Sequence, residues 1–126
     1  MKIAGIGFRQ SASTADLRAA LALTGCAQPD ALASVTVKAN APQMQQLATE
    51  MNLPVIALAE ADIQGLETPT QSPRIQARFG TGSLAEATAL AAAKQGQPEA
   101  TVQLLTPRVI TDNGLATAAI AQRTTT

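Results

Sequence analysis

The stretch Lys2-Ile3-Ala4-Gly5-Ile6-Gly7-Phe8 decides the fold class, because it is a short apolar run at the start of the chain. Such a run, bounded by polar residues, is typical of a buried strand. Further strands and helices alternate after it. Strands that are separated by helices pair in parallel, and the helices then cover the faces of the sheet. The sequence therefore predicts an α/β fold built around this first strand.

Capping residues, prolines and glycines divide the remainder of the chain into elements. Ser13, with Asp16 three residues later, begins a helix that Gly25 ends, and Pro42 opens a second helix at its tolerated first position. The predicted strands are residues 2–8, 33–37, 54–58, 101–106 and 115–121. The predicted helical segments are residues 13–24, 42–51, 59–66, 74–79 and 83–94.

These elements predict a three-layer α/β/α sandwich with a mixed, mostly parallel sheet of about five strands. Asp112-Asn113-Gly114 is a hairpin turn signal, so the last two strands form a C-terminal antiparallel hairpin. With 126 residues the chain has the size of one domain, and we expect a single domain over residues 1–126. The final residues 124–126 are expected to be frayed.

Composition argues against several classes of function. The chain has 9 Lys+Arg and 9 Asp+Glu, and this balance does not provide a broad basic surface for nucleic acid. No His and only one Cys are present, which excludes histidine catalysis, histidine-ligated metals and cysteine zinc clusters. No apolar run is long enough to span a membrane, and no signal peptide is visible. We therefore expect a cytoplasmic protein with no metal, nucleic-acid or membrane partner.

The Gly5-x-Gly7 pair at the end of the first strand invites comparison with a dinucleotide-binding fingerprint. Gln10 stands where that fingerprint needs its third glycine, so the motif fails. The two glycines are better explained by close packing and a sharp turn, and no cofactor is predicted.

Gly80-Thr81-Gly82-Ser83 precedes the strongest predicted helix, with Gly96 just past its end. Exposed amides at a helix start bind anions when glycines leave them accessible, so this segment is a candidate anion site. Ser83 and Glu86 also form the S-x-x-E pattern of a capping box, which explains both residues without any ligand. The two interpretations are compatible, because a capped helix start can still offer the amides of residues 80–82.

Cationic side chains follow several of the predicted elements. Arg9 and Lys38 come just after the first and second strands, and Arg74 and Arg78 flank the segment after a turn-rich loop. Open α/β sheets bind ligands at the carboxyl ends of parallel strands, so Arg9 and Lys38 are expected at one edge. Arg matches carboxylates bidentately, which indicates a polycarboxylate ligand. Each cation taken alone is better explained as an ordinary surface charge.

Short segments in a fixed order carry a family resemblance. They are Gly5-Ile6-Gly7-Phe8-Arg9, Ser34–Lys38, Leu53-Pro54-Val55, Pro69–Ser72, Gly80–Ala87, Leu105–Arg108 and Thr117–Ala121. Together they cover nearly the whole chain, and they resemble the cobalamin-biosynthesis CobE proteins and the C-terminal domain of CbiG. The Gly80–Ala87 segment is the most specific, being similar to the family's G-T-x-S-V-A-E-A motif. One departure is that residues 39–42 lack the acids that the family carries after the lysine.

The resemblance implies a role in cobalamin biosynthesis, on corrin-ring intermediates that carry many acetate and propionate carboxylates. It implies an accessory or carrier protein that binds such an anionic intermediate. The residues expected to bind it are Gly7, Arg9, Lys38, Ser72, Gly80, Thr81, Gly82, Ser83 and Glu86.

Two alternatives remain open on the same resemblance. The first is a cobalt-precorrin-5A hydrolase, or a subunit of one, which opens a lactone. In a chain without His its general base would be a carboxylate, and Glu86 is the candidate catalytic residue. The second is a non-catalytic module that docks on another enzyme of the pathway.

Overall fold

The computed structural model describes residues 1–124 apart from residues 27, 96 and 98, and its described part contains five strands and six helices. In chain order they are β1 (Lys2–Phe8), α1 (Thr14–Leu23), β2 (Ala31–Val35), α2 (Thr36–Ala39), α3 (Pro42–Met51), β3 (Val55–Leu58), α4 (Glu60–Ile63), α5 (Pro73–Phe79), α6 (Leu84–Lys94), β4 (Thr101–Ile110) and β5 (Ala116–Thr124). Gly96 and residues 125–126, which the sequence analysis mentioned, lie outside the described residues. Thr124 pairs with Thr101 at the end of β5, and its expected fraying stays a prediction.

The strands form one mixed sheet in the order β3-β2-β1-β5-β4. β1 pairs in parallel with β2, and β2 with β3, whereas β5 lies antiparallel to both β1 and β4. The mixed five-stranded sheet and the C-terminal hairpin are thus confirmed, although parallel and antiparallel pairings are equal in number. Gly114 has a φ of 72° in the hairpin turn, a conformation that glycine adopts without strain.

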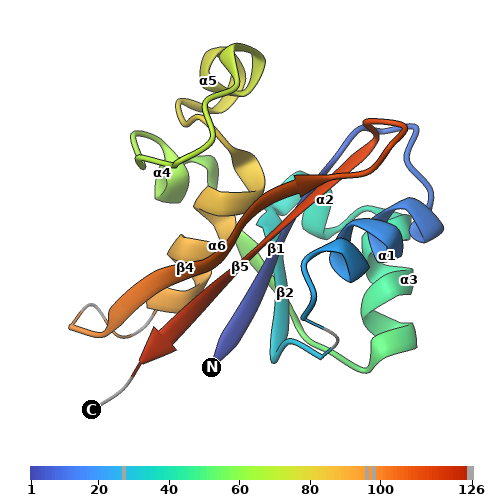
Figure 1. The fold of residues 1–126 in the computed structure, drawn as a ribbon, viewed down its shortest axis with the longest axis horizontal. Coiled ribbons are helices and arrows are strands. Elements are labelled where there is room, and N and C mark those ends of the chain that lie inside the picture. Colours follow the sequence, from blue (N-terminus) through green and yellow to red (C-terminus); the bar gives the residue numbers. More distant parts are fainter. Residues whose placement is uncertain (27, 96, 98, 125–126) are drawn as a thin grey trace.

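Helices cover both faces of the sheet, which confirms the three-layer arrangement (Figure 1). α1 and α3 pack on one face, where Ile6 of β1 meets a core that includes Leu17 and Met44. α6 packs on the other face, where Ile3 belongs to a second core with α6 residues such as Leu84. The alternation of side chains along β1 therefore supplies both cores.

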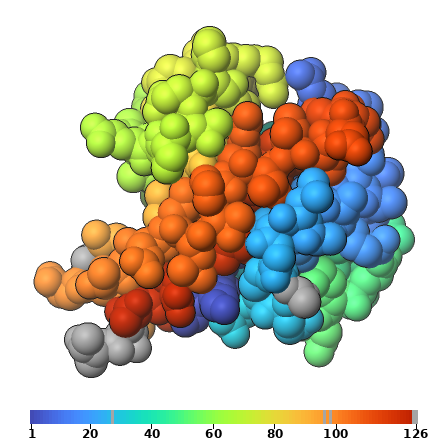
Figure 2. Space-filling view, in the orientation of Figure 1, coloured from blue at the N-terminus to red at the C-terminus, as the bar shows by residue number. Residues whose placement is uncertain are grey.

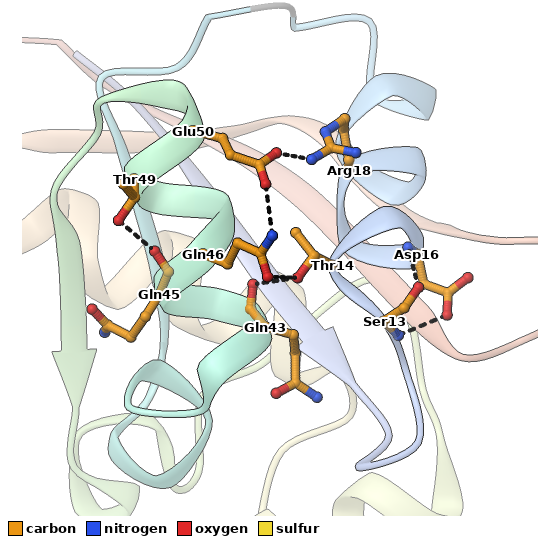
Figure 3. Close-up of polar contacts among 9 residues, drawn as sticks. All are labelled: Ser13, Thr14, Asp16, Arg18, Gln43, Gln45, Gln46, Thr49 and Glu50. Atoms are coloured by element: carbon orange, nitrogen blue, oxygen red, sulfur yellow. Dashed lines mark hydrogen bonds and ion pairs between the residues drawn. The ribbon is translucent and has the colours of Figure 1, made fainter.

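Polar side chains tie α1 to α3 along the outer edge of their contact (Figure 3). Arg18 pairs with Glu50, and Gln46 bridges them to Thr14, whose hydroxyl lies 3.2 Å from the Gln46 side-chain oxygen. The start of α1 is capped in both directions, because the amide of Ser13 donates to Asp16 and the amide of Asp16 donates to Ser13. Gly25, with a φ of 77°, follows the end of α1 as the sequence predicted.

Gly5 allows α6 to lie directly against the backbone of β1. A methyl group at this position would come within 2.0 Å of the Ala85 carbonyl oxygen and 2.7 Å of the Ala89 amide nitrogen. Small residues along α6 complete this close approach, since Ala85 and Ala89 are fully buried. The prediction that these glycines serve close packing is confirmed at Gly5.

The second strand is displaced from its predicted position at residues 33–37. It spans Ala31–Val35, and the chain then turns into α2, so Thr36 and Val37 are exposed. Their β-branched side chains imitated a strand pattern, but the Thr36 hydroxyl donates to the Leu58 carbonyl instead of extending the sheet. Lys38 is consequently a helical residue of α2, half-buried beside the end of β1.

Candidate functional site

A pocket of about 220 Å³ opens at the carboxyl ends of β1 and β2, between α5 and the tip of the β4–β5 hairpin. In the space-filling view a notch separates the lobe of α4 and α5 from the hairpin tip and the segment after β1 (Figure 2). The lining residues come from every element that meets there: Gly7, Phe8, Arg9, Lys38, Ser72, Arg74, Ile75, Phe79, Leu84, Arg108, Ile110, Gly114, Leu115 and Thr117. This volume is below the ~300–1,000 Å³ of pockets that enclose a drug-sized ligand.

The pocket concentrates positive charge in a chain whose net charge is zero. Arg9, Lys38, Arg74 and Arg108 line it, and none of the described residues that line it is acidic. Arg9 and Arg74 are exposed at the rim, while Arg108 is partly buried. Arg78, close by on α5, is paired with Glu60 at 3.0 Å. The arrangement attracts anions, and three guanidinium groups can bind carboxylates bidentately.

Lys38 is held firmly in the wall of this pocket. Its ammonium group donates a hydrogen bond to the Phe8 carbonyl and lies 4.9 Å from the centre of the Phe8 ring. Burial lowers the pKa of Lys38 below its usual 10.5, and repulsion from Arg74 and Arg78 lowers the pKa further. An anion bound between these groups would relieve that repulsion.

The structure brings some of the predicted ligand-binding residues together and separates the others from them. Gly7, Arg9, Lys38 and Ser72 all line the pocket, so the convergence of Arg9 and Lys38 on one edge agrees with the sequence analysis. The remaining five, Gly80, Thr81, Gly82, Ser83 and Glu86, do not line it. Binding by any of them stays a prediction.

The chain itself covers most of the Gly80–Ser83 segment, which the sequence analysis expected to be accessible, and only Gly80 is partly exposed. Thr81, Gly82 and Ser83 are buried. The Thr81 hydroxyl donates to the Leu66 carbonyl at 2.7 Å, and the Gly82 carbonyl accepts from the Ser72 amide at 2.8 Å. A methyl group on Gly82 would lie 2.5 Å from the Thr70 carbonyl oxygen. The glycine is therefore needed for the docking of a neighbouring loop.

Glu86 does not complete the predicted capping box. Ser83 caps α6 by accepting from the Glu86 amide at 3.2 Å, but the Glu86 carboxylate accepts its bonds from Thr70 and Arg108 instead. The side chain is fully buried. A general base must reach its substrate, and Glu86 is not among the residues that line the pocket.

Arg108 is a candidate site residue that the sequence analysis placed only within a family segment. It follows Pro107 in β4, and the register of β4 on β5 shifts between Thr106 and Val109. Pro107 directly follows the strand predicted over residues 101–106, whereas β4 continues through it to Ile110. A proline within a strand marks an edge or a bulge, and bulges redirect side chains. Arg74 was noted as a cation, but its position opposite Arg108 depends on the fold.

The described residues contain no group of three or more acidic or cysteine side chains placed to hold a metal ion. Among the same residues no helix has the length and apolar character that crossing a bilayer requires.

The fold and the pocket define a small α/β protein that presents a cationic pocket at the carboxyl edge of a mixed sheet. Residues 2–121 match the family described as Cobalamin synthesis G C-terminus, and the chain belongs to this family of cobalamin biosynthesis proteins.

Two solved structures are similar over almost the whole chain. The crystal structure of CobE, a protein from the cobalamin (vitamin B12) biosynthetic pathway, has a TM-score of 0.82 and 34% sequence identity; 99% of this chain and 91% of that chain are covered. The cobalamin biosynthesis protein chiG from Agrobacterium tumefaciens str. C58 has a TM-score of 0.68 and 28% identity, over 99% of this chain and 100% of that chain. A comparison with curated proteins gave no match. The resemblance inferred from the sequence is thereby confirmed.

Proposed function

We propose that the protein binds an anionic corrin-ring intermediate of cobalamin biosynthesis and acts as an accessory or carrier protein. The observation that carries the proposal is the pocket in which Arg9, Lys38, Arg74 and Arg108 converge with no acidic residue in its described lining. Family membership supplies the pathway, and corrin intermediates bear the acetate and propionate groups that such a pocket recognises.

The size and lining of the pocket favour binding of one edge of the ring. A volume of about 220 Å³ accommodates side-chain carboxylates and leaves most of a macrocycle outside. The apolar side chains of Phe8, Ile75 and Ile110 lie beside the cations and can contact the ring face. A ligand held this way stays accessible to a second protein, so another cytoplasmic enzyme of the pathway is the proposed partner.

The same geometry favours ligand binding without catalysis over lactone hydrolysis. Hydrolysis needs a group that activates water at the substrate. The described lining of the pocket offers no carboxylate, and Glu86 is buried with both oxygens engaged.

The test is a titration that compares two corrins followed by their visible spectra. Cobyrinic acid carries free side-chain carboxylates, whereas cobinamide carries amides at these positions. We expect saturable binding of cobyrinic acid that weakens with added salt, and much weaker binding of cobinamide. Equal affinities for the two corrins, or binding of neither, would refute the proposal.

Matched variants locate the binding at the pocket. Arg9→Ala and Arg108→Ala should each weaken cobyrinic acid binding about fivefold or more, a loss of roughly 1 kcal/mol for a partly exposed charged contact. Lys94→Ala is the control. It removes an exposed cation at the C-terminal end of α6, which does not line this pocket, and it should change the affinity less than twofold. An equal loss in all three variants would indicate nonspecific attraction.

A further inference from the structure

Glu86 is a buried carboxylate whose partners come from two distant segments. Its Oε1 atom accepts a bond from the Thr70 amide at 2.9 Å, and its Oε2 atom accepts from the Thr70 hydroxyl at 2.9 Å and from the Arg108 amide at 2.8 Å. Among the described residues no cation lies within ion-pair distance of it. Both of its oxygens therefore accept hydrogen bonds from the loop before α5 or from β4.

Both of these segments form walls of the cationic pocket. Ser72 and Arg74 follow Thr70 by a few residues, and Arg108 itself lines the pocket from the other side. The loop is also fastened to the start of α6, because the Ser72 amide donates to the Gly82 carbonyl at 2.8 Å. β4 has an irregular register at Arg108, and its amide at that residue donates to Glu86.

We propose that Glu86 is a positioning residue. Its carboxylate holds the loop before α5, at Thr70, against the irregular part of β4, at Arg108, so that Arg74 and Arg108 converge on one anion. This clamp is a feature of the free protein, and its assignment to corrin carboxylates rests on the proposed function. Glu86 acts through the two segments and does not touch the ligand.

The chemistry of the partners makes glutamate hard to replace. The amides of Thr70 and Arg108 are donors only, and they approach opposite oxygens of the carboxylate. In Glu86→Gln, one end of the side chain becomes an NH₂ donor, so whichever way it turns one backbone N–H loses its acceptor. Thr70→Val removes only the hydroxyl bond and leaves both amide bonds in place. Thr70→Ser keeps all three.

The first experiment measures amide hydrogen exchange of the free protein by NMR. In Glu86→Gln at least one of the Thr70 and Arg108 amides should exchange at least about tenfold faster than in the wild type at matched free energy of unfolding. Ser83→Ala is the control, because it removes the cap of the same helix without touching either segment. Unchanged protection of both amides in Glu86→Gln would overturn the clamp.

The second experiment measures cobyrinic acid affinity in the same variants. We expect Glu86→Gln to weaken binding about fivefold or more and Thr70→Val to weaken it less. Thr70→Ser, and Lys94→Ala at the exposed end of α6, should stay within about twofold of the wild type. If Glu86→Gln does not fold, Thr70→Val against Thr70→Ser decides the outcome, and equal affinity and exchange in this pair would overturn the proposal.

The outcomes separate this inference from the proposed function. A wild-type protein that binds no cobyrinic acid refutes the proposed function, while the exchange rates still decide whether Glu86 is the clamp. A wild type that binds, together with a Glu86→Gln variant that binds equally well, refutes the positioning role alone.

Discussion

Substitution of Gly5 by alanine tests whether the close contact between α6 and β1 organises the whole domain. The added Cβ would lie 2.0 Å from the Ala85 carbonyl oxygen, whereas an ordinary C···O contact is about 3.3 Å or longer. The helix or the strand must therefore move by about 1.3 Å. Both of the nearest atoms, the Ala85 oxygen and the Ala89 nitrogen, belong to backbone, so no side chain can rotate to relieve the contact.

The expected cost follows from this geometry. Overpacking a core by a methyl group usually costs about 1–3 kcal/mol, and a backbone clash places Gly5→Ala at about 3 kcal/mol or more. A domain of this size has a stability of roughly 5–15 kcal/mol, so the variant should fold with a melting temperature lower by roughly 10 °C or more.

Urea unfolding of two glycine variants provides the measurement. At Gly7 an added Cβ meets chiefly the Thr117 hydroxyl, at 2.7 Å, which belongs to a side chain that can rotate. Gly7→Ala should therefore cost about 1 kcal/mol, mostly from the hydrogen bond between Thr117 and the Gly7 carbonyl. A loss below about 1 kcal/mol in Gly5→Ala, or a larger loss in Gly7→Ala, would refute the reasoning.

Two further predictions concern pH. Because burial and nearby arginines lower the pKa of Lys38, cobyrinic acid affinity should fall with rising pH before an ordinary lysine would lose its proton. Lys38→Arg should remove this fall, and identical pH profiles would contradict the role of Lys38. Hydrogen bonds from the Ser13 amide and the Asn113 side chain lower the pKa of Asp16 below 3.8. The ionised Asp16 side chain therefore stabilises the fold fully above pH 3.8, and this stabilisation is lost as the pH falls through the lowered pKa. The difference in unfolding free energy between wild type and Asp16→Asn should accordingly shrink in acid, and a constant difference in urea titrations would contradict this.

Local patterns determined the order and type of most elements. Four such patterns act through neighbouring residues, and the structure contains each of them. They are the apolar run of β1, the cap and stop of α1, the proline that opens α3 and the Asp112-Asn113-Gly114 turn. The second strand was misplaced because exposed β-branched residues in α2 resemble a strand when their burial is unknown.

The candidate site was predictable only in part for the same physical reason. Arg9 and Lys38 follow adjacent parallel strands, and that topology alone places them at one edge. Glu86 matched a local capping pattern, yet its carboxylate bonds to residues 16 and 22 positions away. A sequence pattern reports which bonds a residue can make nearby, whereas a buried carboxylate bonds to whichever donors the packing brings to it. The sequence by itself thus determined the type and order of most elements, the family and two of the pocket's cations. Only the tertiary structure decided that residues 81–83 are buried and that Arg74 and Arg108 line one pocket, because both outcomes depend on packing between segments that are distant in the chain.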